Sequence, residues 1–333
     1  MKLEQMPRYP LLCGFTPLQR MENLEQALGC GPLYIKRDDL TPLGLGGNKT
    51  RKLEFLLGDA LAGGADTLVT VGGVQTNHGR LTAAAAAKAG LACTLVLDGA
   101  RPEELSGNLL LDCLLGASLV YTDGRSAPAV IEETLAALRA AGRAPYFIPE
   151  GGSNAVGSAG YLAMVPELLA QADSLPVPPA RLVCTMGSLG TFAGLWLGAR
   201  AFGAPFSVTG VAVNPTTGYT REKAAALVNE MSAAYGLDIA AAPEDMDIIY
   251  ADAAHDYAGP GYNVPDAKTR GAVELLARTE GIFLDPCYTA KSFRGFCDIA
   301  RELDGGAIFV HTGGTPALWT QEHLDAFAAD YWN

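Results

Sequence analysis

The segment TLVTVGGVQTNHGRLTAAAAAKAGLACTLVLDG, residues 67–99, carries the pattern that decides the fold. Its first residues, 67–71, are strand formers that run up to a glycine pair. An Ala-rich stretch over 81–89 has helical character, and a second run of strand formers covers 94–97. A strand, a helix and a second strand in this order predict a βαβ unit, in which the two strands are parallel.

The same alternation continues along the chain. A helix is expected over 129–141, and further strands are expected at 119–121, 146–149, 182–184, 207–213, 247–250 and 307–311. The apolar runs are too continuous for strands with one solvent-exposed face, so we expect helices to cover both faces of the sheet. The predicted fold class is α/β, with open, twisted, mostly parallel sheets flanked by helices. Because 333 residues exceed one ordinary core, we expect two domains, with the Pro-rich stretch 173–179 as the most linker-like segment.

Composition argues against several classes of function. The formal net charge of −12 disfavours nucleic acid as the main partner, because phosphate backbones attract basic surfaces. The seven cysteines are scattered and form no C-x-x-C pair, so we expect reduced thiols rather than a disulfide framework or a metal site. The first residues lack the apolar core of a signal peptide, and no apolar run reaches the roughly 18 residues of a membrane helix. We therefore expect a soluble, cytoplasmic protein.

The stretch GGNKTRKLE, residues 46–54, places Lys49 directly after two glycines and Asn48. Asn48 is a typical N-cap, so Lys49 is expected in the first turn of a helix, where the helix dipole disfavours positive charge. Arg51 and Lys52 crowd two further cations beside it. Both effects should lower the pKa of Lys49, as a lysine that forms a Schiff base requires. A solvated basic helix start, or a phosphate site without catalysis, would have the same spacing.

Two further loops follow predicted strands and open helices. Residues 72–80 bring Thr76, Asn77 and His78 to a turn whose backbone N–H groups suit a carboxylate. Residues 187–191, GSLGT, allow a phosphate to approach the backbone at a helix start. The second loop matches neither the P-loop nor the dinucleotide glycine pattern, which disfavours those two functions. A capping cluster and an ordinary strand-to-helix turn are the alternative interpretations.

Near the C-terminal end, Tyr288 and Thr289 lie in the stretch 284–292, and Tyr262 lies upstream. Core tyrosines and a helix-capping threonine would give the same pattern. The loop 311–316, HTGGTP, follows another predicted strand. Because loops after parallel strands gather at one end of a sheet, we expect all these segments to surround one ligand site.

Taken together, these segments resemble the family of enzymes dependent on pyridoxal 5′-phosphate (PLP) that contains 1-aminocyclopropane-1-carboxylate (ACC) deaminase, D-cysteine desulfhydrase and L-cysteate sulfo-lyase. The similar segments occur in the family's order over nearly the whole chain. They are 16–18, 34–40, 48–49, 75–78, 151–154, 187–191, 285–291 and 313–314. The resemblance implies the tryptophan synthase β-like fold, called fold type II. It also implies a large PLP-binding domain of residues 1–47 and 165–333, a small domain of residues 48–164, and a homodimer.

The resemblance also assigns roles by position. Lys49 matches the lysine that holds PLP as a Schiff base, and Asn77 matches the partner of the cofactor's ring hydroxyl. Thr76, Asn77 and His78 match positions beside the substrate carboxylate. The phosphate contacts match Lys52, Gly187, Ser188, Leu189, Gly190 and Thr191. Tyr262 and Tyr288 match the pair of active-site tyrosines, and Thr289 matches the residue that faces the pyridine nitrogen.

Two of these positions favour one activity within the family. The deaminase usually has Glu in place of Thr289 and Gln in place of His78, whereas this pair resembles the D-cysteine desulfhydrases. A hydroxyl at the pyridine nitrogen gives a weaker electron sink than a carboxylate, and loss of a good leaving group such as a thiol needs less of that sink. We therefore expect β-elimination from a small amino acid, with Lys49, Thr76, Tyr262 and Tyr288 as catalytic residues. L-Cysteate sulfo-lyase activity, ACC deaminase activity and a catalytically silent PLP-binding protein are the alternatives.

Overall fold

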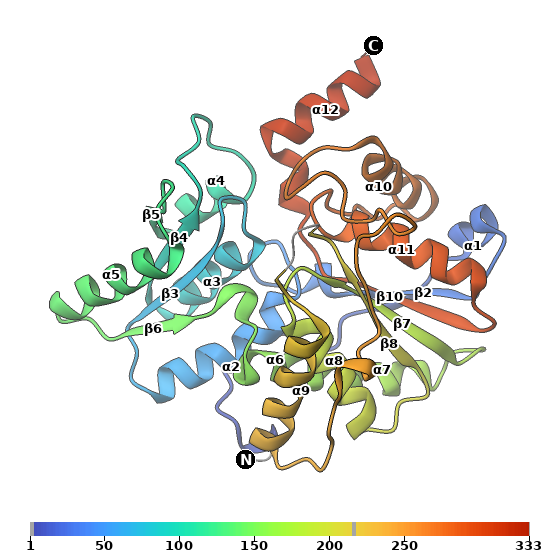
Figure 1. Cartoon of the computed structure of the whole chain (residues 1–333), viewed down its shortest axis with the longest axis horizontal. Helices are drawn as coiled ribbons and strands as arrows, with labels where there is room; N and C mark the ends of the chain where they lie inside the picture. The colour runs from blue at the N-terminus through green and yellow to red at the C-terminus, as the bar shows by residue number, and fades with distance from the viewer. Residues whose placement is uncertain (1–2, 215–217, 333) are drawn as a thin grey trace.

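The strands of the computed structural model, which describes residues 3–214 and 218–332, form two separate sheets (Figure 1). The larger sheet has the order β1-β2-β10-β7-β8-β9. Its strands are β1 Leu18–Arg20, β2 Leu33–Arg37, β7 Pro179–Met186, β8 Ser207–Ala212, β9 Ile248–Ile249 and β10 Gly306–His311. Only the edge strand β1 is antiparallel to its neighbour; the other described pairs are parallel.

The smaller sheet is entirely parallel in its described pairs and has the order β5-β4-β3-β6. Its strands are β3 Thr67–Gly73, β4 Ala92–Asp98, β5 Ser118–Tyr121 and β6 Pro145–Ile148. The βαβ unit predicted from residues 67–99 is therefore confirmed, with α3 as its helix. The expected α/β class with two mostly parallel sheets is confirmed as well.

Each predicted strand is present, but the pattern missed β1 and β2. Both lie before the first apolar run that the alternation identifies, and β2 ends in two basic residues. The strand expected at 247–250 is reduced to Ile248–Ile249, because β9 is an edge strand paired only with β8.

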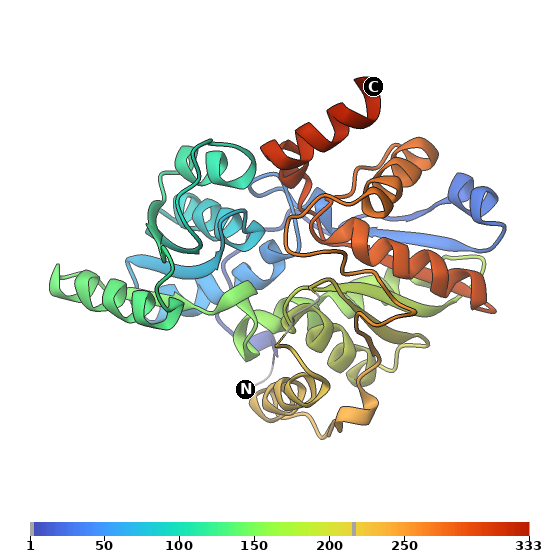
Figure 2. The same cartoon turned by 45° about the horizontal axis from the view of Figure 1, so that its top comes forward.

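Helices cover both faces of the sheets (Figures 1 and 2). They are α1 Glu22–Leu28, α2 Lys49–Ala62, α3 Asn77–Ala89, α4 Gly107–Leu114, α5 Ala127–Ala140, α6 Ala155–Leu162, α7 Met164–Ala172, α8 Gly190–Ala201, α9 Arg221–Tyr235, α10 Ala267–Glu280, α11 Thr289–Glu302 and α12 Gln321–Trp332. The helix expected over 129–141 is α5. None of the helices in the described part of the chain is both long and apolar enough to cross a membrane.

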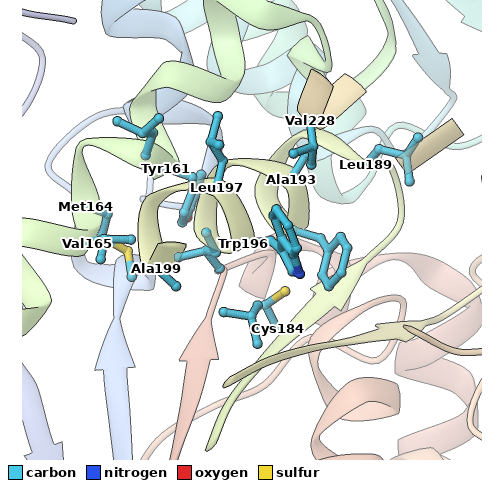
Figure 3. Packing of buried hydrophobic residues seen from close by; sticks show 14 of the residues in the cluster. Tyr161, Met164, Val165, Cys184, Leu189, Ala193, Trp196, Leu197, Ala199 and Val228 are labelled. Carbon is cyan, nitrogen blue, oxygen red and sulfur yellow. The ribbon is translucent and has the colours of Figure 1, made fainter. Parts of the chain in front are cut away.

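The larger sheet is buried on both faces, as its continuous apolar runs predict. Cys184 of β7 points into a cluster with α8 and α9, where Trp196 and Val228 pack (Figure 3). The next residue back, Val183, points to the opposite face and packs with Phe293 of α11. Successive side chains of a strand alternate between faces, so a strand apolar at both positions needs helices on both sides.

A separate core lies under the smaller sheet. Leu56 of α2 and Leu95 of β4 are fully buried there, together with alanines of α3. The run of alanines at 83–87 lets α3 lie close to the sheet, because small side chains hold the helix near the strands. Helix α2 also contributes Phe55 to the other core, so this helix packs between the two halves.

The Pro-rich stretch 173–179 joins α7 to β7, and both of these elements pack into the core of the larger sheet. It therefore does not connect the two sheets, contrary to its linker-like composition. The chain leaves the smaller sheet earlier, after β6, and α6 then contacts both α2 and α8. The domain limits 1–47, 48–164 and 165–333 stay a prediction.

Candidate active site

One cavity lies at the carboxyl ends of parallel strands from both sheets. Loops that follow β3, β6, β7, β8 and β10 contribute to its wall. Nine of the predicted site residues line it: Lys49, Thr76, Asn77, His78, Gly187, Ser188, Thr191, Tyr262 and Tyr288. Four do not line it: Lys52, Leu189, Gly190 and Thr289. Open α/β sheets bind ligands at this edge.

The amine of Lys49 is held at the cavity by the loop before α2. Its Nζ donates to Asn48 Oδ1 at 2.9 Å, and Asn48 Nδ2 donates to Thr191 Oγ1 at 3.0 Å. Asn48 does occupy the position directly before α2, as predicted, but its backbone is already helical and its side chain caps no N–H group. Gly46 has φ +75°, and a Cβ there would lie 1.8 Å from the carbonyl oxygen of Asp39. Only glycine fits this turn into α2.

The pKa of Lys49 is lowered to about 8, mainly because burial removes water from the charged amine. The positive charge of Arg80 lowers the pKa further, whereas Glu150 and Asp285 raise it. The predicted direction is thus confirmed, but the cause differs from the crowding of cations along the helix. Arg51 is neutralised on the far side by Asp38 and Glu167, each at 2.8 Å.

Lys52 is a fully buried cation that forms no ion pair among the residues described. Its Nζ donates to the carbonyl of Gly151 at 2.9 Å. Burial lowers the pKa of Lys52 well below its usual range, and the charge of Lys49 lowers it further. A buried charge is costly unless an opposite charge accompanies it, so this position suits an anionic ligand.

The start of α8 lies directly beside Lys52. A Cβ on Gly190 would lie 2.8 Å from Lys52 Nζ, from Ser153 Oγ and from Ser158 Oγ alike. The hydroxyl of Ser158 is buried and has no hydrogen-bond partner in the described part of the chain. A helix N-terminus, a cation and free hydroxyl groups are the donors that bind a phosphate. The side chain of Leu189, in contrast, is buried in the core (Figure 3), so this residue offers a ligand only its backbone.

The loop after β3 carries the other anion-binding candidates. Thr76 caps α3, because its Oγ1 accepts from the backbone N–H of Gly79 at 3.2 Å. The imidazole of His78 is buried, and neither ring nitrogen makes a hydrogen bond of good geometry among the described residues. Burial and the charges of Lys49 and Lys52 lower the pKa of His78 well below its usual range, so its ring is neutral at pH 7.

Tyr262 and Tyr288 meet edge to face in the cavity wall, with ring centroids 5.8 Å apart and planes at 75°. Burial raises the pKa of both phenols well above the usual value, and the charge of Tyr262 raises the pKa of Tyr288 further. Both hydroxyl groups therefore carry their protons at neutral pH and can donate hydrogen bonds.

Thr289 is held away from the cavity by Asp285. Its hydroxyl donates to Asp285 Oδ1 at 2.6 Å and accepts from the backbone N–H of Asp285 at 2.8 Å. The same carboxylate accepts from the N–H groups of Tyr288 and Thr289, each at 2.8 Å, at the start of α11. The side chain that accepts from the first N–H groups of α11 is thus Asp285 and not Thr289, and the predicted contact of Thr289 with the pyridine nitrogen stays a prediction.

The list of predicted site residues left out half of the cavity wall: Asn48, Glu150, Gly151, Thr185, Val213, Asn214, Cys287, Thr312 and Gly313. Most of these directly follow a predicted strand, so the rule that loops gather at the carboxyl edge could have found them. Four of these, Asn48, Cys287, Thr312 and Gly313, lie in segments that were expected to surround the ligand. Glu150 is exposed at the cavity and accepts from the hydroxyl of Tyr219 at 2.7 Å. Burial raises the pKa of Cys287 to about 12, so its thiol stays protonated.

These groups fit PLP. The buried Lys52, the free Ser158 hydroxyl and the start of α8 supply an anion site, and the amine of Lys49 lies in the same cavity with a pKa suited to imine chemistry. Among the described residues, no three His, Cys, Asp or Glu side chains cluster in a way that could hold a metal ion.

Residues 10–313 match the family described as pyridoxal-phosphate dependent enzyme. The chain belongs to this family. The cofactor of this PLP enzyme is therefore pyridoxal phosphate. Its relatives include D-cysteine desulfhydrase of Yersinia enterocolitica, 41% identical over 96% of this chain and 97% of the relative. A putative 1-aminocyclopropane-1-carboxylate deaminase of Pyrococcus abyssi is 39% identical over 95% of this chain and 94% of the relative.

Solved structures agree with this assignment of the PLP enzyme. A crystal structure of an ACC deaminase homologue superimposes with a TM-score of 0.88 at 36% identity and covers 98% of this chain and 97% of that one. A fungal L-serine ammonia-lyase from Rhizomucor miehei has a TM-score of 0.66 at 19% identity and covers 98% of this chain and 100% of that one, which shows the shared fold. The predicted fold type II architecture is confirmed.

Proposed function

We propose that this PLP enzyme is a carbon–sulfur lyase that eliminates the thiol of D-cysteine as sulfide, after which water hydrolyses the remaining aminoacrylate to pyruvate and ammonia. One observation carries the proposal: the weakly basic amine of Lys49 lies in one cavity with two protonated tyrosines. The relatives named D-cysteine desulfhydrase, which are 41% identical over nearly the full length, support the substrate.

In this proposal residues of this chain would hold the cofactor at both ends. Lys49 would hold its aldehyde carbon, while Lys52 and the backbone of residues 187–191 would hold its phosphate. Asn77 would donate to its ring oxygen, and Thr289 would face its pyridine nitrogen. Bound PLP supplies the electron sink that allows a proton to leave the α-carbon of the substrate.

The substrate carboxylate is bound by the start of α3, where Thr76, Asn77 and His78 meet the cavity. His78 acts there as a neutral hydrogen-bond donor, in line with the lowered pKa of its ring. The amine of Lys49, with a pKa of about 8, takes the α-proton. The phenol of Tyr288 keeps its proton because burial raises its pKa, so it would donate a hydrogen bond to the sulfur, which leaves as hydrosulfide, with Tyr262 packed against this phenol.

The decisive experiment removes the amine. Lys49→Ala is expected to lose the visible absorbance of lysine-bound PLP and at least about 10³-fold in turnover of D-cysteine, since the variant lacks both the covalent link and the base. Absorbance spectra of the purified protein, recorded during titration with D- and L-cysteine, give both readouts. Full turnover with an unchanged spectrum in the variant would refute the proposal.

L-Cysteate sulfo-lyase activity is a less favoured alternative, because Glu150 places a carboxylate at the cavity. A substrate with a sulfonate side chain would meet like charge there, whereas a thiol would not. We expect Glu150→Gln to raise kcat/KM for L-cysteate roughly threefold to tenfold and to leave that for D-cysteine within twofold, since the carboxylate is exposed and partly screened. Sulfite and sulfide assays separate the two reactions, and an equal change for both substrates would contradict this role of Glu150.

ACC deaminase activity would be recognised by 2-oxobutanoate as the product. A catalytically silent PLP-binding protein would instead bind PLP and turn over no member of a broad amino-acid panel. The product assays above therefore distinguish all three alternatives from the proposed reaction.

We also propose a cytoplasmic homodimer. Seven free thiols support a reducing compartment, and two of them, Cys13 and Cys113, are exposed. Exposed apolar side chains support a partner surface: Phe15, Leu114, Trp319 and Trp332 are each more than half exposed. Helix α12, which carries Trp332, projects from the rest of the chain (Figures 1 and 2). Light scattering coupled to size-exclusion chromatography tests the dimer.

A further inference from the structure

A line of buried side chains leads to Asn77 from outside the cavity. Arg80 Nη1 donates to Asn108 Oδ1 at 2.9 Å, and Asn108 Nδ2 donates to Asn77 Oδ1 at 2.9 Å. Both Arg80 and Asn108 are fully buried, and neither lines the cavity. Asn77 does line it, so these two residues reach the site only through Asn77.

The chemistry of the two outer groups fixes the direction of every hydrogen bond in this line. A guanidinium can only donate, so the atom of Asn108 that faces Arg80 must be its oxygen. The backbone carbonyl of Gln75 can only accept, and it receives the other N–H of Asn108 Nδ2 at 2.8 Å. The amide of Asn108 is thereby fixed from both sides.

The orientation of the Asn77 amide follows from that of Asn108. Because Asn108 presents an N–H, the oxygen of Asn77 faces Asn108, which lies outside the cavity, and the Nδ2 donor of Asn77 lies on the other side of the amide. That Nδ2 lies 2.8 Å from the place where a Cβ on Gly314 would stand, beside the loop after β10. A rotated amide would present lone pairs there instead of a donor.

We propose that Arg80 and Asn108 are positioning residues that hold Asn77 as a hydrogen-bond donor to the ring oxygen of PLP. This inference rests on the proposed cofactor contact of Asn77. This role explains why a buried arginine lies beside a neutral amide. Because Arg80 can only donate, it fixes which atom of Asn108, and in turn which atom of Asn77, accepts a hydrogen bond.

Two further contacts anchor the line to the backbone. Arg80 Nη2 donates to the carbonyl of Gly46 at 2.8 Å, in the turn that leads to Lys49. The backbone N–H of Asn108 donates to Gln75 Oε1 at 2.8 Å, which ties the start of α4 to the loop after β3. Arg80 of α3 therefore connects the turn that leads to Lys49 with the start of α4, which carries Asn108.

The test is an isosteric change that reverses the polarity. Asn108→Asp keeps the contact with Arg80 but replaces the N–H donor by an acceptor, so Asn77 must turn its Nδ2 away from the cavity. We expect about tenfold weaker PLP binding, as for the loss of one hydrogen bond to a charged oxygen. We also expect a shift of the visible absorbance maximum and of its pH midpoint, measured on the holoenzyme by equilibrium dialysis and spectrophotometric titration.

A double-mutant cycle separates positioning from structural damage. In an Asn77→Ala background there is no amide to orient, so Asn108→Asp should change neither PLP affinity nor spectrum by more than twofold. An equal loss in both backgrounds would overturn the proposal. If Asn108→Asp does not fold, Asn108→Ala, which frees the amide to rotate, is expected to weaken PLP binding about threefold to tenfold, and unchanged binding would likewise overturn it.

Asp112→Asn is the matched control. Asp112 is buried and interacts with Arg80 only through its charge, and neither carboxylate oxygen has a hydrogen-bond partner in the described chain. Its replacement should leave PLP affinity and spectrum within twofold. Should the wild-type protein bind no PLP at all, the proposed function fails; wild-type binding with unchanged Asn108 variants defeats only the positioning role.

Discussion

The starts of α3 and α8 both face the cavity after a parallel strand and a glycine-containing turn, yet they are built differently. At α3, the backbone of Thr76 is extended, and its side chain caps the helix by accepting from the N–H of Gly79. At α8, Leu189 is already helical and its side chain caps nothing, the backbone N–H of Gly190 donates to Ser153 Oγ at 3.0 Å, and the buried Lys52 lies beside Gly190. Of the two described starts, only that of α8 therefore has a cation beside its N–H groups, and this combination suits a dianion such as phosphate.

The largest effect is expected at the α8 start. Lys52→Met should weaken PLP binding about 100-fold, since a hydrogen bond to a charged group contributes roughly 1.5–3 kcal/mol. The same change removes an uncompensated buried cation and should raise the melting temperature of the PLP-free protein. Equilibrium dialysis and thermal melts measure the two effects.

Lys88→Met is the control, because Lys88 is exposed in the last turn of α3. Unchanged PLP affinity in Lys52→Met would mean that the two helix starts do not differ in the way described.

The next effect concerns the rate at which the PLP-free protein takes up PLP. The amine of Lys49 reacts only when neutral, and its pKa of about 8 means that it is mostly protonated at pH 7. The rate should therefore rise about tenfold from pH 6 to pH 7 and level off above pH 8. Stopped-flow absorbance follows the reaction. A rate that keeps climbing up to pH 10 would indicate an ordinary, solvated lysine.

The smallest effect is expected at the α3 start. Thr76→Val removes the cap and should lower the free energy of unfolding by about 1 kcal/mol, with little change in PLP affinity. The KM for D-cysteine should rise more than PLP affinity falls, since this start is assigned to the substrate. Urea unfolding and steady-state kinetics measure these changes, and Thr76→Ser, which keeps the hydroxyl, is the control. A loss of PLP affinity as large as that of Lys52→Met would erase the contrast between the two starts.

The arrangement of strands could be predicted from the sequence because buried parallel strands leave continuous apolar runs, as at 67–71 and 94–97. The loops at the carboxyl edge then follow from topology, which is why nine of the predicted residues meet in one cavity. The edge strand β1 has no such run, and the pattern missed it together with its neighbour β2, which ends in two basic residues.

The directions of side chains were not predictable in the same way. Asn48 has the residue type of a cap but reaches Thr191, 143 residues away in the chain. Thr289 turns to Asp285 because a buried carboxylate needs donors nearby. Lys52 and Leu189 belong to or lie beside the predicted phosphate loop 187–191, yet neither of them lines the cavity. Such contacts depend on tertiary neighbours, and spacing along the chain does not encode them.

Helix α2 has a further consequence for how the cofactor is held. One side of it packs Leu56 under the smaller sheet, and Arg51 on another side is clamped by Asp38 and Glu167 of the larger half. The helix is therefore anchored in both halves at once. Lys49 is its first residue, so the amine assigned to the cofactor stands on an element that the two cores share.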